Sequence, residues 1–283
     1  EGIGLHSGAS IKMTLHPSKV GTGIVFFRSD IGKSGYIPAR WENVTETTLA
    51  TTISNVCGVS VGTVEHLMAG LAGCGIDNLL IEIDGPEVPA MDGSAAPFIA
   101  LIEAAGTRIQ NAPKRAIKIK DTIQVSSSES FIKLSPSETF EVSFEIDFDK
   151  TSLARQSLDM PLMNGAFKKE IASARTFGFA SDVAAMRKAG LALGGSLDNA
   201  IVIADDTILN KGGLRYENEF VRHKILDCVG DLYLAGAPIL GKISAYRSGH
   251  SLNHALLRSL FKNEDAWSYE DLKTAVTPGT AQN

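Results

Sequence analysis

The sequence predicts an α+β protein of two domains of similar size. Both halves mix short β-branched runs with apolar helical segments, and neither shows the regular β-α alternation of a doubly wound sheet. The length of 283 residues exceeds the size at which a single hydrophobic core usually stops growing. Small and polar residues at 111–113 mark the expected boundary between an N-terminal domain, 1–111, and a C-terminal domain, 112–283.

In the N-terminal domain, short apolar runs bounded by Gly, Asp or Asn predict strands. They fall at 11–15, 24–28, 47–53 and 78–83. Thr63 can cap a helix that ends before Gly73, and Ser94 can cap another over 95–105, with Gly106 just past its end. The domain is therefore expected to mix strands with two helices.

In the C-terminal domain, residues 140–148 alternate apolar and polar side chains without interruption. This period of two predicts a strand with one buried and one wet face. Neighbouring strands are expected at 117–120 and 131–134. Helical patterns follow at 166–174, 181–189, 219–235 and 252–262, the last capped by Ser251.

The composition is that of a folded, water-soluble protein. Hydrophobic residues make up 44% of the chain, too many for a disordered one. The longest uncharged apolar run, 232–241, is about half the length that a membrane helix needs. A net charge of −5 argues against a nucleic-acid partner, which selects for a surplus of Lys and Arg. The three cysteines are widely spaced and form no CxxC, so we expect a reducing, cytoplasmic compartment. We also expect the protein to be a monomer.

A polar stripe on the longest predicted helix is the first candidate metal site. His223, Asp227 and Asp231 are spaced four residues apart, which places them along one helix face. A histidine and a carboxylate one turn apart can offer nitrogen and oxygen to one metal ion. Such a pair more often makes ordinary hydrogen bonds to a neighbouring element, and that alternative stays open. The rest of the helix is apolar, which favours charges that are paired, metal-bound or in a cleft.

Glu65 and His66 form a second candidate, in the first turn of the helix after Thr63. Adjacent helical residues point about 100° apart, so His66 can ligate a metal while Glu65 reaches a water beside it. A glutamate in the first turn also complements the helix dipole, and this explanation is equally good. The remaining histidines are ambiguous (His6), expected at the surface by default (His250), or expected to be structural (His16 and His254).

Several common catalytic motifs are missing. The chain has no Gly-x-Ser-x-Gly elbow and no HExxH motif. The glycine-rich segment 194–196 lacks the Lys-Ser/Thr of a P-loop, and the basic cluster 114–120 fits a solvated strand edge. Residue chemistry alone favours a single-metal hydrolase with His66, His223 and Asp227 as ligands. Three nitrogen and oxygen ligands with an open fourth position are typical of catalytic zinc.

Six segments in order give the chain a specific resemblance. They are 4–8, 63–67, 91–98, 174–179, 221–227 and 248–250. With these segments the sequence resembles the UDP-3-O-acyl-N-acetylglucosamine deacetylases, which catalyse the committed step of lipid A biosynthesis. The resemblance implies two domains of similar topology, each a sheet with helices, whose helical layers pack face to face with the active site between them.

The resemblance also implies a role for each matching site residue, with Zn²⁺ as the cofactor. His66, His223 and Asp227 would bind the ion, although two histidines and one carboxylate also suit Fe²⁺. Glu65 would act as general base on the attacking water, and His250 as a cationic general acid. The remaining positions would stabilise the oxyanion (Thr176), orient His250 (Asp231) and approach the anionic substrate (Lys224). The products would be acetate and UDP-3-O-acyl-glucosamine.

The same resemblance implies the contacts to the substrate, a nucleotide sugar that carries a fatty chain. An insert over 180–202 would line an apolar channel with Val183, Ala192, Ser196, Ala200 and Val202, although such residues commonly just pack. Phe148 would stack on the uracil, but its place in the alternating strand also fits core packing. Where some relatives carry a basic residue this chain has Glu129 and Ser130, so Arg247 is the candidate for the diphosphate. His6 and Phe177 complete the expected substrate contacts.

Two other functions stay open at this point. A metal-dependent hydrolase of another amide or of a peptide would use the same three ligands but would need no uracil pocket. A catalytically silent binding module would purify without zinc. The occupied positions Glu65 and His250 argue against the silent module.

Overall fold

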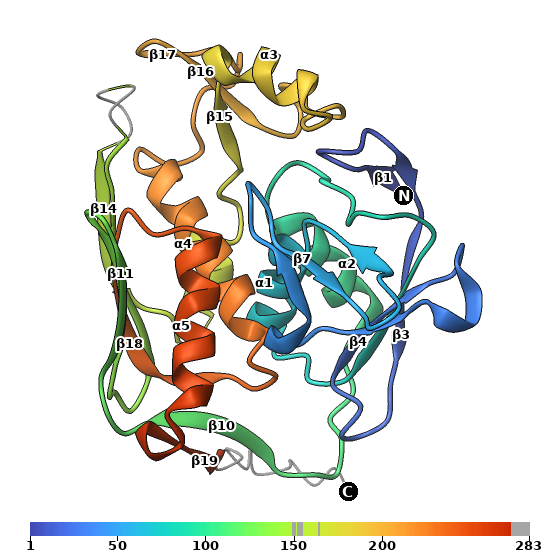
Figure 1. The fold of residues 1–283 in the computed structure, drawn as a ribbon, viewed down its shortest axis with the longest axis vertical. Helices are drawn as coiled ribbons and strands as arrows, with labels where there is room; N and C mark the ends of the chain where they lie inside the picture. The colour runs from blue at the N-terminus through green and yellow to red at the C-terminus, as the bar shows by residue number, and fades with distance from the viewer. Residues whose placement is uncertain (149–150, 152–154, 164, 273–283) are drawn as a thin grey trace, which may run out of the picture.

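The computed structural model describes residues 1–148, 151, 155–163 and 165–272. It confirms the α+β class: a β-sheet lies on each outer side and the helices of both halves lie between the sheets (Figure 1). Helix α1 (Glu65–Cys74) of the N-terminal half packs against α4 (Glu219–Tyr233) of the C-terminal half. The predicted face-to-face packing of helical layers is therefore present.

The N-terminal half is built on the sheet β3-β9-β4-β5. Strand β9 (Leu79–Ile83) runs parallel to β4 (Ile24–Arg28) and antiparallel to β3 (Met13–Pro17), and β5 (Tyr36–Pro38) pairs with β4. Alternate side chains of β4 and β9 are buried under the helices. The smaller elements are β1 (Gly2–Ile3), β2 (Ser10–Ile11), β6 (Val44–Glu46), β7 (Thr52–Ser54), β8 (Ser60–Val61), α2 (Ala96–Ala105) and the 3₁₀ turns Gly32–Ser34 and Trp41–Asn43.

The C-terminal half is built around β18 (Ile239–Tyr246), which pairs with β10 (Lys114–Ile119), β12 (Ser130–Ser135) and β13 (Phe140–Ile146). The outer strands are β11 (Ile123–Ser127), β14 (Gln156–Pro161) and β19 (Trp267–Leu272). The alternating strand predicted over 140–148 is confirmed in β13 as far as Ile146, with Val142, Phe144 and Ile146 buried, whereas Phe148 lies beyond the strand and is half-buried. Helix α4 packs on β13, and α5 (His250–Lys262) packs on β11 and β12. A 3₁₀ turn, Glu264–Ala266, leads into β19.

A separate small lobe contains the expected insert (Figure 1, yellow). It consists of β15 (Phe177–Phe179), α3 (Ala180–Lys188), β16 (Ile201–Ala204) and β17 (Thr207–Ile208). Strand β16 pairs parallel to β15 and antiparallel to β17. None of the residues of α3 is fully buried, and the helix packs against β15 and β16 through half-buried side chains such as Val183 and Met186. Among the described residues, no helix is both long and apolar enough to cross a bilayer.

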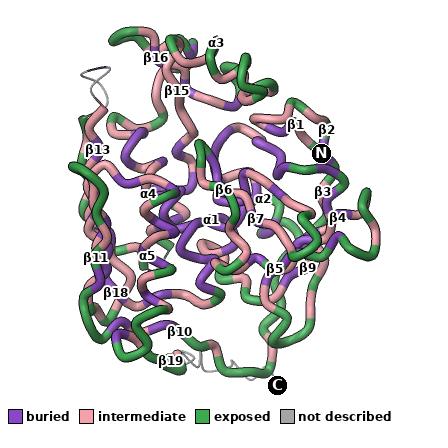
Figure 2. The backbone as a smooth tube through the Cα atoms, viewed as in Figure 1, coloured by how far each residue is buried: buried purple, intermediate pink, exposed green. Residues whose placement is uncertain are grey.

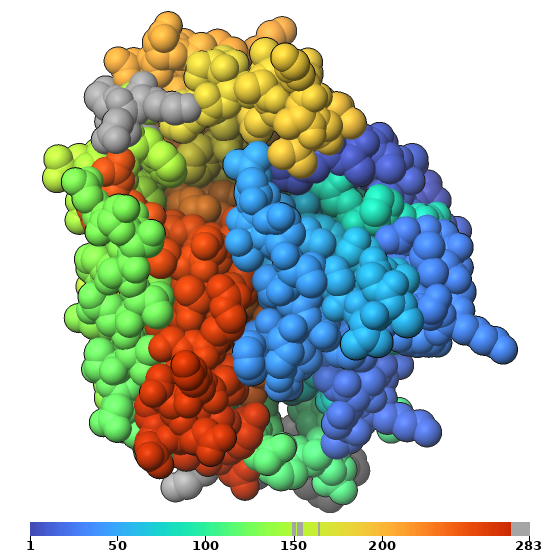
Figure 3. Space-filling model, in the orientation of Figure 1, coloured from blue at the N-terminus to red at the C-terminus, as the bar shows by residue number. Residues whose placement is uncertain are grey.

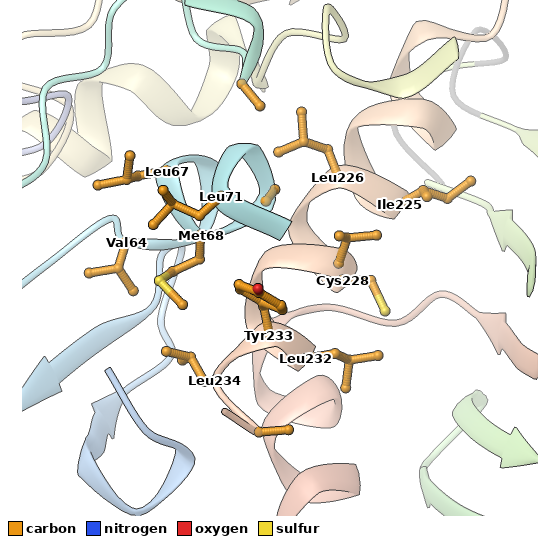
Figure 4. Close-up of a cluster of buried hydrophobic side chains, with 14 of the residues drawn as sticks. Val64, Leu67, Met68, Leu71, Ile225, Leu226, Cys228, Leu232, Tyr233 and Leu234 are labelled. Atoms are coloured by element: carbon orange, nitrogen blue, oxygen red, sulfur yellow. The ribbon is translucent and has the colours of Figure 1, made fainter. Parts of the chain in front are cut away.

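Buried residues are concentrated where α1 meets α4, as the purple stretches of both helices in Figure 2 show. Figure 4 shows apolar side chains of both helices in one cluster, among them Leu71 and Leu226. Gly230 of α4 lies directly against the backbone of Glu65, so the absence of a side chain permits this close approach. The Tyr233 hydroxyl donates to the carbonyl of Ile76, 2.8 Å away, and ties the end of α4 to the N-terminal half.

Two local predictions in the N-terminal half are wrong because a glutamate carboxylate accepts hydrogen bonds from the predicted segment. Residues 47–51 form a bend rather than part of a strand. The Glu46 carboxylate accepts the backbone N–H groups of Thr47 and Thr48, and Leu49 has a φ of +63°, outside the β region. Thr63 does not cap α1, since its hydroxyl donates to Glu87 and its φ is +55°.

Helix ends differ from the predictions in other places as well. Helix α1 continues past Gly73, which packs against the ring of Phe167, and ends at the left-handed Gly75 with a φ of +67°. The predicted helix over 166–174 is a short π-helical turn, Phe167–Ile171. Ser251 is not a cap, because α5 already begins at His250. His250 is therefore the buried first residue of a helix and not a surface loop residue.

Candidate active site

His66, His223 and Asp227 converge where α1 faces α4. His66 lies in the first turn of α1, and the other two lie one turn apart on α4. The Oδ1 atom of Asp227 is 3.3 Å from His223 Nε2 and 3.5 Å from His66 Nε2. All three side chains are buried, and their candidate ligand atoms lie within 4.8 Å of one another. The structure thus brings together two segments that are far apart in the sequence.

The candidate ligands His66, His223 and Asp227 form a set that fits a metal cation. The Nδ1 atom of His223 lies 3.1 Å from the carbonyl oxygen of Ala174, which can only accept, so this nitrogen carries the proton. Burial lowers the pKa of His223 to about 4, so its ring is neutral and Nε2 presents a lone pair. That lone pair faces Asp227 Oδ1, an acceptor with no hydrogen-bond partner among the described residues. A metal cation between two buried acceptors that face each other in this way would satisfy both of them.

Glu65 and His250 lie beside this donor set. The Nε2 atom of His250 is 3.8 Å from Glu65 Oε1 and 3.9 Å from Asp227 Oδ2. The backbone N–H of Thr51 donates to Glu65 Oε2 over 3.0 Å and fixes the carboxylate. Burial raises the pKa of Glu65, which moves this carboxylate towards the basicity of a proton acceptor at neutral pH.

The Asp231 carboxylate is the centre of a buried hydrogen-bond network. Its Oδ2 accepts from His250 Nδ1 and from Asn253 Nδ2, both at 2.8 Å. Its Oδ1 lies 2.6 Å from the hydroxyl of Thr51 and 3.2 Å from His254 Nε2. Burial alone would lower the pKa of His250, but the charge and hydrogen bond of Asp231 outweigh it and raise the pKa to about 9. His250 is therefore held as a cation.

Lys224 lies on α4 beside Asp227, and Thr176 lies in the segment that leads into β15. The ammonium of Lys224 donates to Asp227 Oδ2 over 2.6 Å. Burial would lower the pKa of Lys224, but the Asp227 carboxylate raises it. Thr176 immediately precedes β15, and its backbone N–H donates to the carbonyl of Gly93 over 2.8 Å.

A buried ion pair anchors the segment that leads into Thr176. The guanidinium of Arg175 donates to both carboxylate oxygens of Glu219, over 2.8 and 3.0 Å. The same carboxylate accepts the backbone N–H of Arg175 over 3.0 Å. This bidentate geometry fixes the chain from Ala174, which orients His223, to Thr176.

His6 lies in the turn between β1 and β2 and rests on the insert. Its Nδ1 accepts the backbone N–H of Ala192 over 3.4 Å, and its carbonyl accepts that of Leu193 over 3.1 Å. The buried Glu87 carboxylate accepts the N–H groups of His6 and Ser7 and so holds the turn. Figure 3 shows this contact between the N-terminal turn, dark blue, and the insert, yellow.

The other predicted insert residues are spread over the small lobe. Val183 lies on α3 and Val202 on β16, both half-buried. Ser196 is exposed, and its carbonyl accepts the backbone N–H of Ala200 over 3.1 Å. The lobe also exposes large apolar side chains: Leu193, Leu197 and Leu209 are each about half exposed, at 52%, 48% and 44%. Such a surface is able to contact an apolar ligand.

Phe148 belongs to a cluster of aromatic side chains that extends to the candidate metal ligand His223. Its ring lies 5.6 Å from that of Phe177 and 5.8 Å from that of Phe179, edge to face. The ring of Phe177 lies 6.2 Å from that of His223. Arg247 directly follows β18, where its backbone N–H donates to the carbonyl of Glu145 at the end of β13 and its guanidinium is 3.4 Å from Glu129. Arg247 lines a surface depression of about 370 Å³ together with Ser130 and His250, among others.

Sequence reasoning missed three residues of this site: Thr51, Asn253 and His254. His254 could have been found, because it stands four residues after His250 on one helix face. A lone threonine such as Thr51 belongs to no motif, and its partners lie about 180 and 200 residues away in the sequence. Only the fold brings it into the site.

A buried His/His/Asp set with a carboxylate and an imidazolium beside it, between two α+β halves, is the arrangement of a single-metal hydrolase. A sequence model of the family described as LpxC, UDP-3-O-acyl N-acetylglycosamine deacetylase, matches residues 1–262. The chain belongs to this family.

Curated relatives carry the name UDP-3-O-acyl-N-acetylglucosamine deacetylase. The protein from Acidithiobacillus ferrooxidans is 52% identical over 98% of this chain and 91% of its own length. The one from Myxococcus xanthus is 51% identical over 94% of this chain and 85% of its own length. The one from Shewanella oneidensis is 48% identical over 94% of this chain and 88% of its own length.

Proposed function

We propose that this protein hydrolyses the N-acetyl group of UDP-3-O-acyl-N-acetylglucosamine and releases acetate and UDP-3-O-acyl-glucosamine, the committed step of lipid A biosynthesis. Its family and its relatives at about half identity support this reaction. The observation in the structure that carries the proposal is the juxtaposition of Glu65 and His250 beside the buried donor set of Asp227. One carboxylate and one imidazolium at one centre can serve as the general base and the general acid of amide hydrolysis.

We further propose that His66, His223 and Asp227 hold Zn²⁺, with Fe²⁺ as the alternative ion for the same ligands. The facing acceptors of His223 and Asp227 support a cation at this position. When bound, such an ion polarises the amide carbonyl and lowers the pKa of water at the site to about 7. The hydrogen bond from His223 Nδ1 to Ala174 keeps the ring in the tautomer that ligation needs.

The protein's own side chains would move the protons. Glu65 accepts a proton from the attacking water as the water oxygen bonds to the acetyl carbon. Thr176 helps to hold the charge that develops on the carbonyl oxygen. His250, kept protonated by Asp231, donates its Nε2 proton to the nitrogen as the C–N bond breaks. Acetate and a free amine result, and Glu65 and His250 return to their starting charges by proton exchange with solvent.

The remaining predicted residues are proposed to bind the substrate. Lys224 approaches the substrate anion, and Arg247, in the depression beside His250, binds the diphosphate. Phe148 and Phe177 contact the uracil side, and His6 closes the site against the insert. The acyl chain is proposed to lie along the insert, whose half-exposed apolar side chains support this position. The proposed lining residues are Val183, Ala192, Ser196, Ala200 and Val202.

The division of the chain and its setting are also proposals. We place the domain boundary between residues 111 and 112, which is supported by the end of α2 at Ala105 and the start of β10 at Lys114. We place the protein in the cytoplasm as a monomer, and the free thiols of Cys57, Cys74 and Cys228 support the reducing compartment.

Turnover of the proposed substrate tests the function directly. The purified protein should release acetate and a free amine from UDP-3-O-acyl-N-acetylglucosamine and should carry about one zinc per chain. A chelator should abolish the activity, and added Zn²⁺ should restore it. Activity on other acetamides but not on this nucleotide sugar would favour a different amidase, and a chain that purifies without metal and stays inactive after Zn²⁺ is added would favour a silent binding module.

A further inference from the structure

Thr51 occupies an unusual place between the two halves of the protein. It belongs to the N-terminal half and precedes β7, yet its side chain is fully buried among residues of α4 and α5. Its backbone N–H donates to Glu65 Oε2, while its hydroxyl lies 2.6 Å from Asp231 Oδ1. One residue therefore touches both the proposed base and the partner of the proposed acid.

The direction of the hydrogen bonds around Thr51 follows from proton counting. Asp231 is ionised, because the charges and hydrogen bonds of His250 and His254 overcome the effect of burial and lower its pKa far below its usual range. A carboxylate only accepts, so the single hydroxyl proton of Thr51 points to Asp231 Oδ1. The Thr51 oxygen then accepts from His254 Nε2, which lies 2.9 Å away. The chain of donors runs from His254 through Thr51 to Asp231.

The hydroxyl of Thr51 adds a third hydrogen bond to the Asp231 carboxylate. A carboxylate has about four acceptor positions. In the structure Oδ2 accepts from His250 and Asn253, and Oδ1 accepts from Thr51 and lies within 3.2 Å of His254. Three of these positions are filled by hydrogen bonds from His250, Asn253 and Thr51, so the carboxylate cannot rotate without losing one of them. Its Oδ2 therefore stays 2.8 Å from His250 Nδ1, and the Nε2 atom of the same ring stays oriented towards Asp227.

We propose that Thr51 is a positioning residue for catalysis: its hydroxyl, supported by His254, locks the Asp231 carboxylate and so aims the imidazole of His250. The proposal rests on the assignment of His250 as general acid in the proposed deacetylase reaction. It also makes the catalytic geometry depend on docking of the two halves, because Thr51 comes from one half and the residues that it orients come from the other.

Two substitutions of Thr51 separate the hydroxyl from the shape of the side chain. Thr51→Val keeps the branched shape and the backbone N–H to Glu65 but removes the hydroxyl, and Thr51→Ser keeps the hydroxyl. We expect Thr51→Val to lower kcat by about 10- to 100-fold, the usual effect of removing a partner behind a site residue, with KM and zinc content nearly unchanged. Thr51→Ser should stay within about threefold of the parent. Equal losses in the two variants, or normal kcat in Thr51→Val, would overturn the proposal.

If Thr51→Val does not fold, Thr51→Ala removes the same hydroxyl with less bulk, and the comparison of Thr51→Ala with Thr51→Ser provides the same test.

A double-mutant cycle then tests whether Thr51 acts through Asp231. The hydroxyl should matter little once the carboxylate is gone, so Thr51→Val should cost less than about twofold in an Asp231→Ala background. An equal cost in both backgrounds would show that Thr51 acts in another way.

A measurement without substrate keeps this proposal separate from the deacetylase assignment. The Nδ1 proton of His250, bonded to Asp231, should give a downfield NMR signal in the zinc-loaded parent protein and in Thr51→Ser. In Thr51→Val the signal should shift or broaden, because the carboxylate is no longer locked. An unchanged signal would refute the positioning role even if the parent deacetylates its substrate. A parent that does not turn over the substrate but shows the expected NMR change would refute only the deacetylase assignment.

Discussion

Replacing Gly230 with alanine should weaken both the fold and metal binding. A β-carbon here would overlap the carbonyl oxygen of Glu65 and would lie 2.8 Å from its carbonyl carbon. Ordinary contacts begin at 3.4 Å, so the carbonyl carbon alone requires α1 and α4 to separate by 3.4 − 2.8 = 0.6 Å at this point, and the closer carbonyl oxygen requires more. Backbone atoms block the new methyl group, so a change of side-chain rotamer cannot relieve the overlap.

The separation acts on the proposed metal ligands because they lie on both helices. His66 is on α1, and His223 and Asp227 are on α4. Metal–ligand distances tolerate changes of only about 0.2 Å, so a movement of 0.6 Å is large. In an unconstrained helix the change from glycine to alanine stabilises by about 1 kcal/mol, whereas overpacking costs about 1–3 kcal/mol. We therefore expect a net loss of up to about 2 kcal/mol in the free energy of unfolding and a weaker metal affinity.

Gly70→Ala is the matched control on the facing helix. A β-carbon at Gly70 would lie 3.4 Å from the Phe98 side chain and 3.6 Å from the Ala95 carbonyl, which are ordinary contacts. This variant should be as stable as the parent or more stable. Urea denaturation with and without chelator gives the stability, and competition with a chromogenic chelator gives the metal affinity. A Gly230→Ala protein that matches the parent in both would show that the helices do not lie this close.

Four shorter predictions concern the charged residues of the site. Glu65→Ala should keep its metal but lose about 10²- to 10⁴-fold in kcat; near-normal turnover would exclude Glu65 as the base. Asp227→Ala should lose metal affinity because a ligand is gone, so undiminished zinc after dialysis would remove it from the ligand set. The pKa of His250 is raised to about 9 and its acid form is lost above that pH, so Asp231→Asn should move the alkaline fall of kcat to lower pH. A pH profile with an unmoved alkaline limb would contradict this role of Asp231. Glu219→Ala should cost about 3–5 kcal/mol in chemical denaturation because it leaves a nearly buried arginine unpaired; a loss below 1 kcal/mol would mean that the pair is dispensable.

Local periodicity was enough to predict much of the secondary structure. The alternation from Phe140 defines β13, and the apolar pattern with a polar stripe defines α4. On α4 the spacing of His223 and Asp227 alone put two candidate ligands on one face. These predictions held because helix and strand periods depend on neighbouring residues, which the sequence shows directly.

Predictions from local sequence patterns were wrong where a polar group forms a hydrogen bond with a partner that the pattern does not show. Thr63 is a good helix cap by composition, but its hydroxyl binds Glu87 instead. The strand predicted through residues 47–51 is broken because Glu46 bonds to the next two N–H groups. The hydrogen-bond energy gained in each case is similar to that of the structure it replaces, so the sequence alone could not decide between them.

The fold class, the principal helices and strands, and the residue types able to bind a metal can all be predicted from local patterns in the amino-acid sequence. The tertiary structure decided how these residues meet. It placed His66 within 3.5 Å of Asp227, it buried His250 at the start of a helix, and it joined Thr51 to Asp231. The physical reason is that these contacts depend on the packing of α1 against α4, where Gly230 permits a close approach that no local pattern encodes.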